Sequence, residues 1–262
     1  MQIERRFIFR GNASGVAAHI LRPKNELLPV QAASSLPVIG GVSESKAKGR
    51  KLKFVSFKSA STKAVGEFDD AQGELDITLH KRPLDSVPTT TRVQSEVRGL
   101  RIEDRVKISL TRAFLVGHSP KDDSNEPDIH PEGNRIEGVY IDGAELKVTL
   151  SEDIFCKCGT YGRLRAMTKD KSASSSQCLY ESDGIIYCTL VKELSWAKKK
   201  PKTAEIDGHT VVVENFGTLY FAEIFISATL RRLTMFRGRL GSPAGGRVSS
   251  GEVETNGSNF PA

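Results

Sequence analysis

The sequence lacks the motifs that identify most nucleotide-binding proteins and many hydrolases. Its 262 residues contain neither Gly-x4-Gly-Lys-Ser/Thr nor Gly-x-Gly-x-x-Gly, the glycine-rich loops that hold phosphates. Gly117-His118-Ser119 begins like a hydrolase nucleophile turn, but Lys121 stands where glycine is required. Pro120 has no N–H to offer an oxyanion hole. We therefore expect no cofactor and favour a protein that is not an enzyme.

Cysteine is scarce and is spaced unlike a metal site. The four cysteines are Cys156, Cys158, Cys178 and Cys188. Structural zinc sites usually use cysteine pairs separated by two to four residues, and this chain has no such pair. The spacing favours free thiols, with disulfides and a metal site as the alternatives.

Long apolar runs are also missing. No stretch approaches the roughly 18–20 residues that span a bilayer. The first ten residues, Met1–Arg10, lack the apolar run of roughly 7–15 residues found in a secretory signal. We expect no membrane span, and a place in the cytoplasm or in an assembly.

Two hairpin signals dominate what is present. Asp142-Gly143 and Asp207-Gly208 each lie between β-rich runs, and Asp-Gly readily adopts the positive φ angles of a tight hairpin turn. Residues 92–100 and 105–116 alternate with period 2, which is typical of half-buried antiparallel strands. In 105–116, one face is expected to carry Val106, Ile108, Leu110, Phe114 and Val116. Short helices are predicted over 159–171 and 191–200. The fold class is mainly β, an antiparallel β-sandwich or barrel-like fold with one or two short helices.

The most apolar stretch, residues 218–227, predicts a central strand covered on both faces. One side is expected to carry Leu219, Phe221 and Phe225, and the other Tyr220, Ala222, Ile224 and Ile226. Glu223 would then need a cationic partner, for which Arg231 and Arg232 are nearest in sequence.

Composition divides the chain into three parts. Residues 1–45 are interpreted as a strand and an extended arm, 46–240 as a β-rich domain with a possible division into 46–155 and 156–240, and 241–262 as a Gly/Ser/Pro-rich tail. Arms that cannot bury their own surface become ordered against a neighbouring subunit. The leading hypothesis is a non-enzymatic structural or protein-interaction module that self-associates as a homo-oligomer. The expected contact residues are Phe7, Phe9, Arg10, Leu36, Val38, Ile39 and Phe260.

Positive charge supports an alternative hypothesis. The net charge is +6, the pI is about 9.1, and basic residues gather in 46–63 and 231–247. If these segments converge, Lys51, Lys53, Arg237 and Arg239 would bind an anionic polymer, either nucleic acid or an acidic polysaccharide.

The acidic loop 122–132 supports a third hypothesis. Its candidate ligands for a divalent cation are Asp122, Asp123, Asp128 and Glu132, although the spacing of an EF-hand is absent. A solvated loop is the simpler interpretation. A hydrolase or lyase on a β scaffold would require Asp128, His130 and Glu132 to converge at a pocket.

Overall fold

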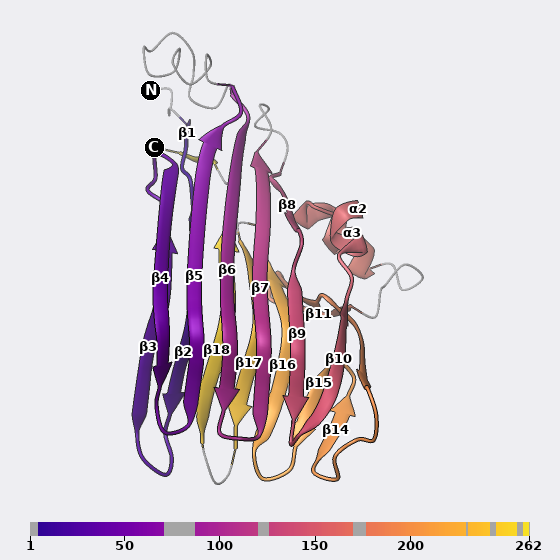
Figure 1. The fold of residues 1–262 in the computed structure, drawn as a ribbon. Coiled ribbons are helices and arrows are strands. Elements are labelled where there is room, and N and C mark those ends of the chain that lie inside the picture. The colour runs from indigo at the N-terminus through magenta and orange to yellow at the C-terminus, as the bar shows by residue number, and fades with distance from the viewer. Residues whose placement is uncertain are drawn as a thin grey trace.

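The protein is a β-sandwich of two open antiparallel sheets packed face to face, as the sequence predicted (Figure 1). The computed structural model describes residues 5–70, 87–119, 126–169, 177–228, 230–241, 245–255 and 259–261. A separate two-stranded sheet pairs β1 (Arg5–Phe7) with β19 (Asn259–Pro261). Among the described residues, no helix is both long and apolar enough to cross a membrane.

One sheet has eight strands. They include β4 to β7, which are the longest strands of the protein and follow one another in the chain. Its order is β13-β10-β9-β7-β6-β5-β4, and β8 pairs with β7. The strands are β4 (Gly41–Lys51), β5 (Val55–Phe68), β6 (Thr89–Ile102), β7 (Val106–Ser119), β8 (Asp128–Pro131), β9 (Arg135–Ile141), β10 (Ala144–Leu150) and β13 (Val191–Trp196). The Asp142-Gly143 turn joins β9 to β10, which confirms the first hairpin.

The other sheet has nine strands in the order β11-β12-β16-β17-β18-β2-β3, with the β14–β15 hairpin added beside β16. The strands are β2 (Gly11–Ile20), β3 (Glu26–Ser35), β11 (Cys178–Ser182), β12 (Ile185–Thr189), β14 (Ala204–Asp207), β15 (Thr210–Val213), β16 (Gly217–Ile226), β17 (Arg231–Leu240) and β18 (Gly246–Thr255). Asp207-Gly208 joins β14 to β15, so the second hairpin is also confirmed.

The arms expected at both ends are strands instead. β2 and β3 occupy much of the region interpreted as an extended connection, and β18 lies between β17 and β2. The sequence did not predict these strands because their inward positions carry small residues such as alanine, serine and glycine. The opposite sheet lies close to these positions, so larger apolar side chains, which would have shown the alternation of a strand, do not fit there. β2 and β3 pack over β5, and β18 packs over β6 and β7.

Two short helices, α2 (Asp153–Lys157) and α3 (Tyr161–Lys169), follow β10. α3 confirms the helix predicted over 159–171. The N–H of Gly162 in its first turn donates to Glu126 Oε2 at 2.7 Å, a favourable place for negative charge. The helix predicted over 191–200 is wrong. Its Val191–Trp196 segment is strand β13, which pairs with β10. This pairing buries the side chains of Val191 and Leu194 in the core.

Each sheet is crossed by a crease where the inward and outward alternation of side chains changes phase. In the nine-stranded sheet, the residues opposite one another along it are Ala222, Met235, Gly251, Gly15 and Ala32. In the eight-stranded sheet they are Gly49, Lys58, Gly99, Ser109 and Gly138. Five of the ten crease residues have positive φ, for example +46° at Ala222 and +66° at Gly251.

The crease decides which side chains of β16 are buried. Leu219 and Phe221 turn inward before Ala222, whereas Ile224 and Ile226 turn inward after it. Tyr220 and Phe225 therefore share the outer face, which corrects the predicted division of this strand. The same change of phase in β7 places Thr111, Ala113 and Leu115 inside and Phe114 outside, against the prediction for Phe114.

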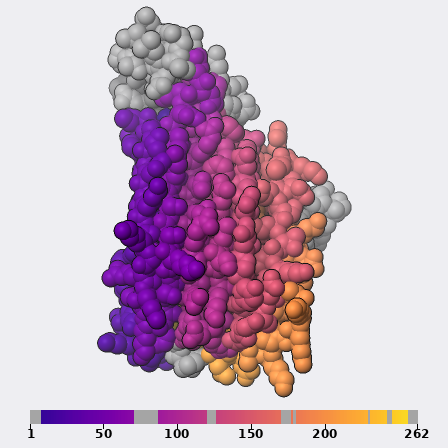
Figure 2. All heavy atoms as spheres, viewed as in Figure 1, coloured from indigo at the N-terminus to yellow at the C-terminus, as the bar shows by residue number. Residues whose placement is uncertain are grey.

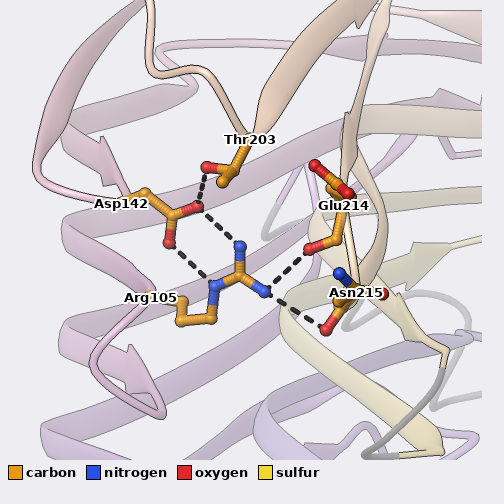
Figure 3. A network of polar contacts seen from close by, with 5 residues as sticks. All are labelled: Arg105, Asp142, Thr203, Glu214 and Asn215. Atoms are coloured by element: carbon orange, nitrogen blue, oxygen red, sulfur yellow. Dashed lines mark hydrogen bonds and ion pairs between the residues drawn. The ribbon is translucent and has the colours of Figure 1, made fainter.

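A polar network ties the hairpin turns of the two sheets together at one end (Figure 3). Arg105, between β6 and β7, donates from Nε and Nη2 to the Asp142 carboxylate at 2.8 and 2.6 Å. Its Nη1 donates to the carbonyls of Glu214 and Asn215 at 2.9 and 3.2 Å. The Thr203 hydroxyl also donates to Asp142. Asp142, expected only to form a turn, thus also joins the sheets.

Replacing Asp142 by Asn should reduce the free energy of unfolding by about 1–3 kcal/mol at neutral pH, since partly buried charged hydrogen bonds are lost. The Arg105 guanidinium holds the pKa of Asp142 below its ordinary value of 3.8. The stabilisation is therefore complete above pH 3.8 and declines as the pH falls through the lowered pKa. Urea titrations of both proteins at pH 7 and in strong acid should show the difference shrink in acid. A constant difference would contradict the ionic origin.

Candidate ligand groove

A groove of about 540 Å³ opens on the outer face of the nine-stranded sheet. Its walls come from β11, β12, β15, β16 and β17, which are adjacent in the sheet but span residues 178–240 of the chain. The lining side chains include Tyr180, Tyr187, His209, Thr210, Tyr220, Glu223, Phe225, Arg237 and Arg239. We call this the aromatic groove.

Three aromatic rings form a wall across neighbouring strands. Tyr180 lies opposite Tyr187, and Tyr187 lies opposite Phe225. The two tyrosine rings stack with centroids 4.4 Å apart, and the Phe225 ring meets Tyr187 edge-on at 4.9 Å. These are favourable aromatic geometries, so the three rings stabilise one another's positions in the protein without a ligand.

A second hollow of about 300 Å³ shares that wall. Ile185, Leu230 and Arg232 line it together with Tyr187 and Phe225. Arg232 donates to Glu254, which raises the pKa of Arg232 above its usual value. The two hollows therefore lie beside one aromatic wall, and each contains an arginine.

The arginine of the larger hollow is held in place on two sides. Arg237 donates from Nε and Nη2 to Glu223 at 2.7 and 2.8 Å, and its guanidinium lies 3.8 Å from the Tyr220 ring centroid. The hydrogen bond to Glu223 raises the pKa of Arg237. The partner of Glu223 is thus Arg237, not Arg231 or Arg232 as predicted. The hairpin register brings Arg237 near, whereas Arg231 turns inward and is 2% exposed.

Positive charge continues beyond this pair. Arg239 is exposed and lies directly opposite Arg247 on β18. Like charges opposite each other on neighbouring strands repel. An anionic ligand in the aromatic groove would relieve that repulsion.

The two basic segments highlighted by the sequence do not converge. Lys51 and Lys53 lie at the turn between β4 and β5 of the eight-stranded sheet. Arg237 and Arg239 lie on β17 of the other sheet. A single site containing all four is therefore excluded by the packing of the sandwich.

Several predicted contact residues have other positions. Phe9 and Leu36 are buried in the core, and Phe9 packs edge-on against Phe68 at 5.4 Å, so neither is a surface contact. Val38 and Ile39 are 62% and 82% exposed, and Arg10 is exposed. The backbones of Phe7 and Phe260 lie in β1 and β19, and their side chains fall outside the described residues.

The acidic-loop candidates do not form a described site. Asp122 and Asp123 fall outside the described residues, whereas Asp128 lies 3.8 Å from His130 Nδ1. Glu132 is exposed. Within the described ranges, no group of three or more His, Cys, Asp or Glu side chains is placed to hold a metal ion. Cys156 and Cys158 are free thiols.

The sequence signal for the aromatic groove was incomplete. Arg237 and Arg239 were found through charge, whereas Tyr180 and Tyr187 carried no motif. Tyr220 and Phe225 were expected in a packed core, because the phase change at Ala222 leaves no mark in the composition.

Comparison with known proteins adds a family. A family model described as "Domain of unknown function (DUF8256)" matches residues 7–171. Searches of curated proteins and of solved structures gave no match. The groove strands β11 to β17 follow the matched residues.

Proposed function

The chain belongs to the DUF8256 family, described only as a domain of unknown function, and we propose that it binds single-stranded nucleic acid in the aromatic groove. The observation that carries this proposal is the wall of Tyr180, Tyr187 and Phe225 with an arginine-containing hollow on either side. Bases stack on such rings regardless of sequence, and arginines bind the phosphates that link them.

The dimensions of the site support a polymer. From Arg239 to Arg232 along β17, seven residues at about 3.3 Å each give roughly 23 Å. That length suits several linked units better than one small molecule. A base offers a flat π face to tyrosine, which the saturated rings of an acidic polysaccharide do not. Nucleic acid is therefore favoured over the polysaccharide within the anionic-polymer hypothesis.

Replacing Tyr187 and Phe225 together by Leu should weaken binding of a labelled oligothymidylate about 10- to 100-fold, since each stacked base contributes about 1–3 kcal/mol. Fluorescence anisotropy at moderate salt measures this affinity. Arg239→Gln should weaken binding and reduce the salt dependence by about one counterion.

Phe114→Leu is the matched control, because Phe114 is a partly exposed aromatic residue on the outer face of the other sheet, away from the aromatic groove, and should leave the affinity unchanged. No oligonucleotide binding by the wild-type protein, or equal losses in both variants, would reject the proposal. Binding of labelled hyaluronate without binding of the oligonucleotide would favour the polysaccharide.

We propose self-association as a second function, favoured by where apolar side chains are exposed. Leu21, Leu27, Val30, Val38, Ile39 and Val42 are each about half exposed or more, and all lie on or beside β3 and β4. These two strands contact each other and form the same edge of the sandwich. Open strand edges and apolar surface favour contact with a second copy.

Light scattering after size exclusion should show a dimer at high micromolar concentration for the wild-type protein. The double change of Val38 and Ile39 to Asp should give a monomer, because charge would be buried at the contact. Val212→Asp alters an exposed valine of β15 and should leave the dimer intact. A wild-type monomer at all concentrations would exclude this function.

A further inference from the structure

A basic band crosses the outer face of the eight-stranded sheet, on the opposite side of the molecule from the aromatic groove. Figure 2 views this face, formed by the side chains of β4 to β10. The register places Lys51 opposite Ser56, Ser56 opposite Arg101, and Arg101 opposite Lys107. These residues therefore form one row across four strands.

The row continues to the other edge of the sheet. Lys107 lies opposite Tyr140, and Tyr140 lies opposite Glu145. The Glu145 carbonyl accepts the N–H of Ala197 at 3.0 Å, directly before Lys198, Lys199 and Lys200. We use the name basic band for Lys51, Arg101, Lys107 and these three lysines.

The charges in the band are poorly compensated. Within the part of the chain that the structure describes, Lys51, Arg101 and Lys107 form no ion pair, although Arg101 and Lys107 lie directly opposite each other. Elsewhere on the same face, Lys63 pairs with Glu44 and Arg92 pairs with Glu67. Directly opposed like charges destabilise a sheet, and an anionic partner would offset that cost.

We infer that the basic band binds the phosphate backbone of double-stranded nucleic acid, lying across the strands. From β4 to the loop after β13, six strand spacings of about 4.8 Å give roughly 29 Å. Duplex DNA advances 3.4 Å per base pair, so the band matches roughly eight base pairs. The partner and the surface both differ from those of the proposed function.

The surface favours a duplex over a membrane. Tyr140 is the large apolar side chain exposed in the row, at 38%. Surface helices and anchors that bind membranes bury apolar side chains among the lipids. Contact through charge alone suits phosphates and carries no sequence information.

The test is the fluorescence anisotropy of a labelled blunt DNA duplex, titrated with the protein at several salt concentrations between about 50 and 200 mM. We expect K51Q/R101Q/K107Q to weaken binding at least tenfold at the lower salt and to reduce the slope of log affinity against log salt by about three. The matched control K157Q/R163Q/K169Q removes the same charge from exposed residues of α2 and α3 and should keep the wild-type affinity.

Absence of salt-dependent binding by the wild-type protein would overturn the inference. Equal losses in both triple variants would also overturn it, because net charge alone would then explain binding. Binding to vesicles rich in phosphatidylserine without binding to the duplex would assign the band to a membrane instead. The Tyr187→Leu/Phe225→Leu protein should retain duplex affinity, so failure of this inference is distinguishable from failure of the proposed function.

Discussion

Replacing Phe221 by Ala should lower the free energy of unfolding by about 3–5 kcal/mol, because a fully buried ring is removed and a cavity remains. Phe221 is 1% exposed and lies opposite Phe236, with the ring centroids 5.8 Å apart. Both rings lie on middle strands of the nine-stranded sheet. The neighbouring strands are paired on both sides there, so they cannot easily move to fill the cavity. Chemical denaturation followed by circular dichroism measures the loss.

Phe225→Ala is the control for this change, because it removes the same ring from the outer face of the same strand. It should cost much less stability while weakening oligonucleotide binding. If Phe221→Ala barely changes unfolding but weakens assembly, the ring belongs to an interface between copies. If neither quantity changes, the assignment of this strand to the core is wrong.

Gly15→Ala should destabilise the fold by about 3 kcal/mol, the upper part of the usual range for overpacking. An added Cβ at Gly15 would lie 2.4 Å from the Gln31 carbonyl oxygen and 2.8 Å from Ala60 Cβ. The first contact is with the neighbouring strand and the second is with the opposite sheet. The Gln31 carbonyl and the Ala60 side chain cannot move away without separating paired strands. The added methyl group must therefore deform the crease.

Gly117→Ala tests whether any added methyl group has this effect. Gly117 is also buried in a strand, but its added Cβ would meet Ile129 at 3.4 Å, which is ordinary packing. Thermal melting should therefore distinguish the two variants clearly. Equal melting temperatures would show that the crease tolerates a wider spacing between the sheets.

The sequence predicted the local features of this fold well. Asp-Gly turns act within a few residues, so both hairpins were found, and the alternation in Thr89–Ile102 and Val106–Ser119 marked the long strands. Features that depend on distant partners were missed. Gly15 and Gly251 are glycines because residues of other strands lie close to them. From composition alone, segments rich in such small residues were interpreted as flexible arms.

The aromatic groove was predictable only in part for the same reason. Its residues come from strands whose order in the sheet does not follow the order of the chain. Tyr187 and Phe225 are neighbours through pairing of β12 with β16, across the whole β13–β15 segment. The clustering of positive charge in the sequence identified Arg237 and Arg239. No local sequence pattern could show which aromatic rings lie beside them in the folded protein.

The position of β18 has a consequence for biosynthesis. Residues 246–255 leave the ribosome after all the other strands of the nine-stranded sheet, yet they separate β17 from β2 in the finished sheet. Until they emerge, the nine-stranded sheet exists as two halves, each with an unpaired edge strand. The nine-stranded sheet is therefore completed by one late insertion, and a chain terminated before Gly246 would expose two unpaired strand edges that favour aggregation.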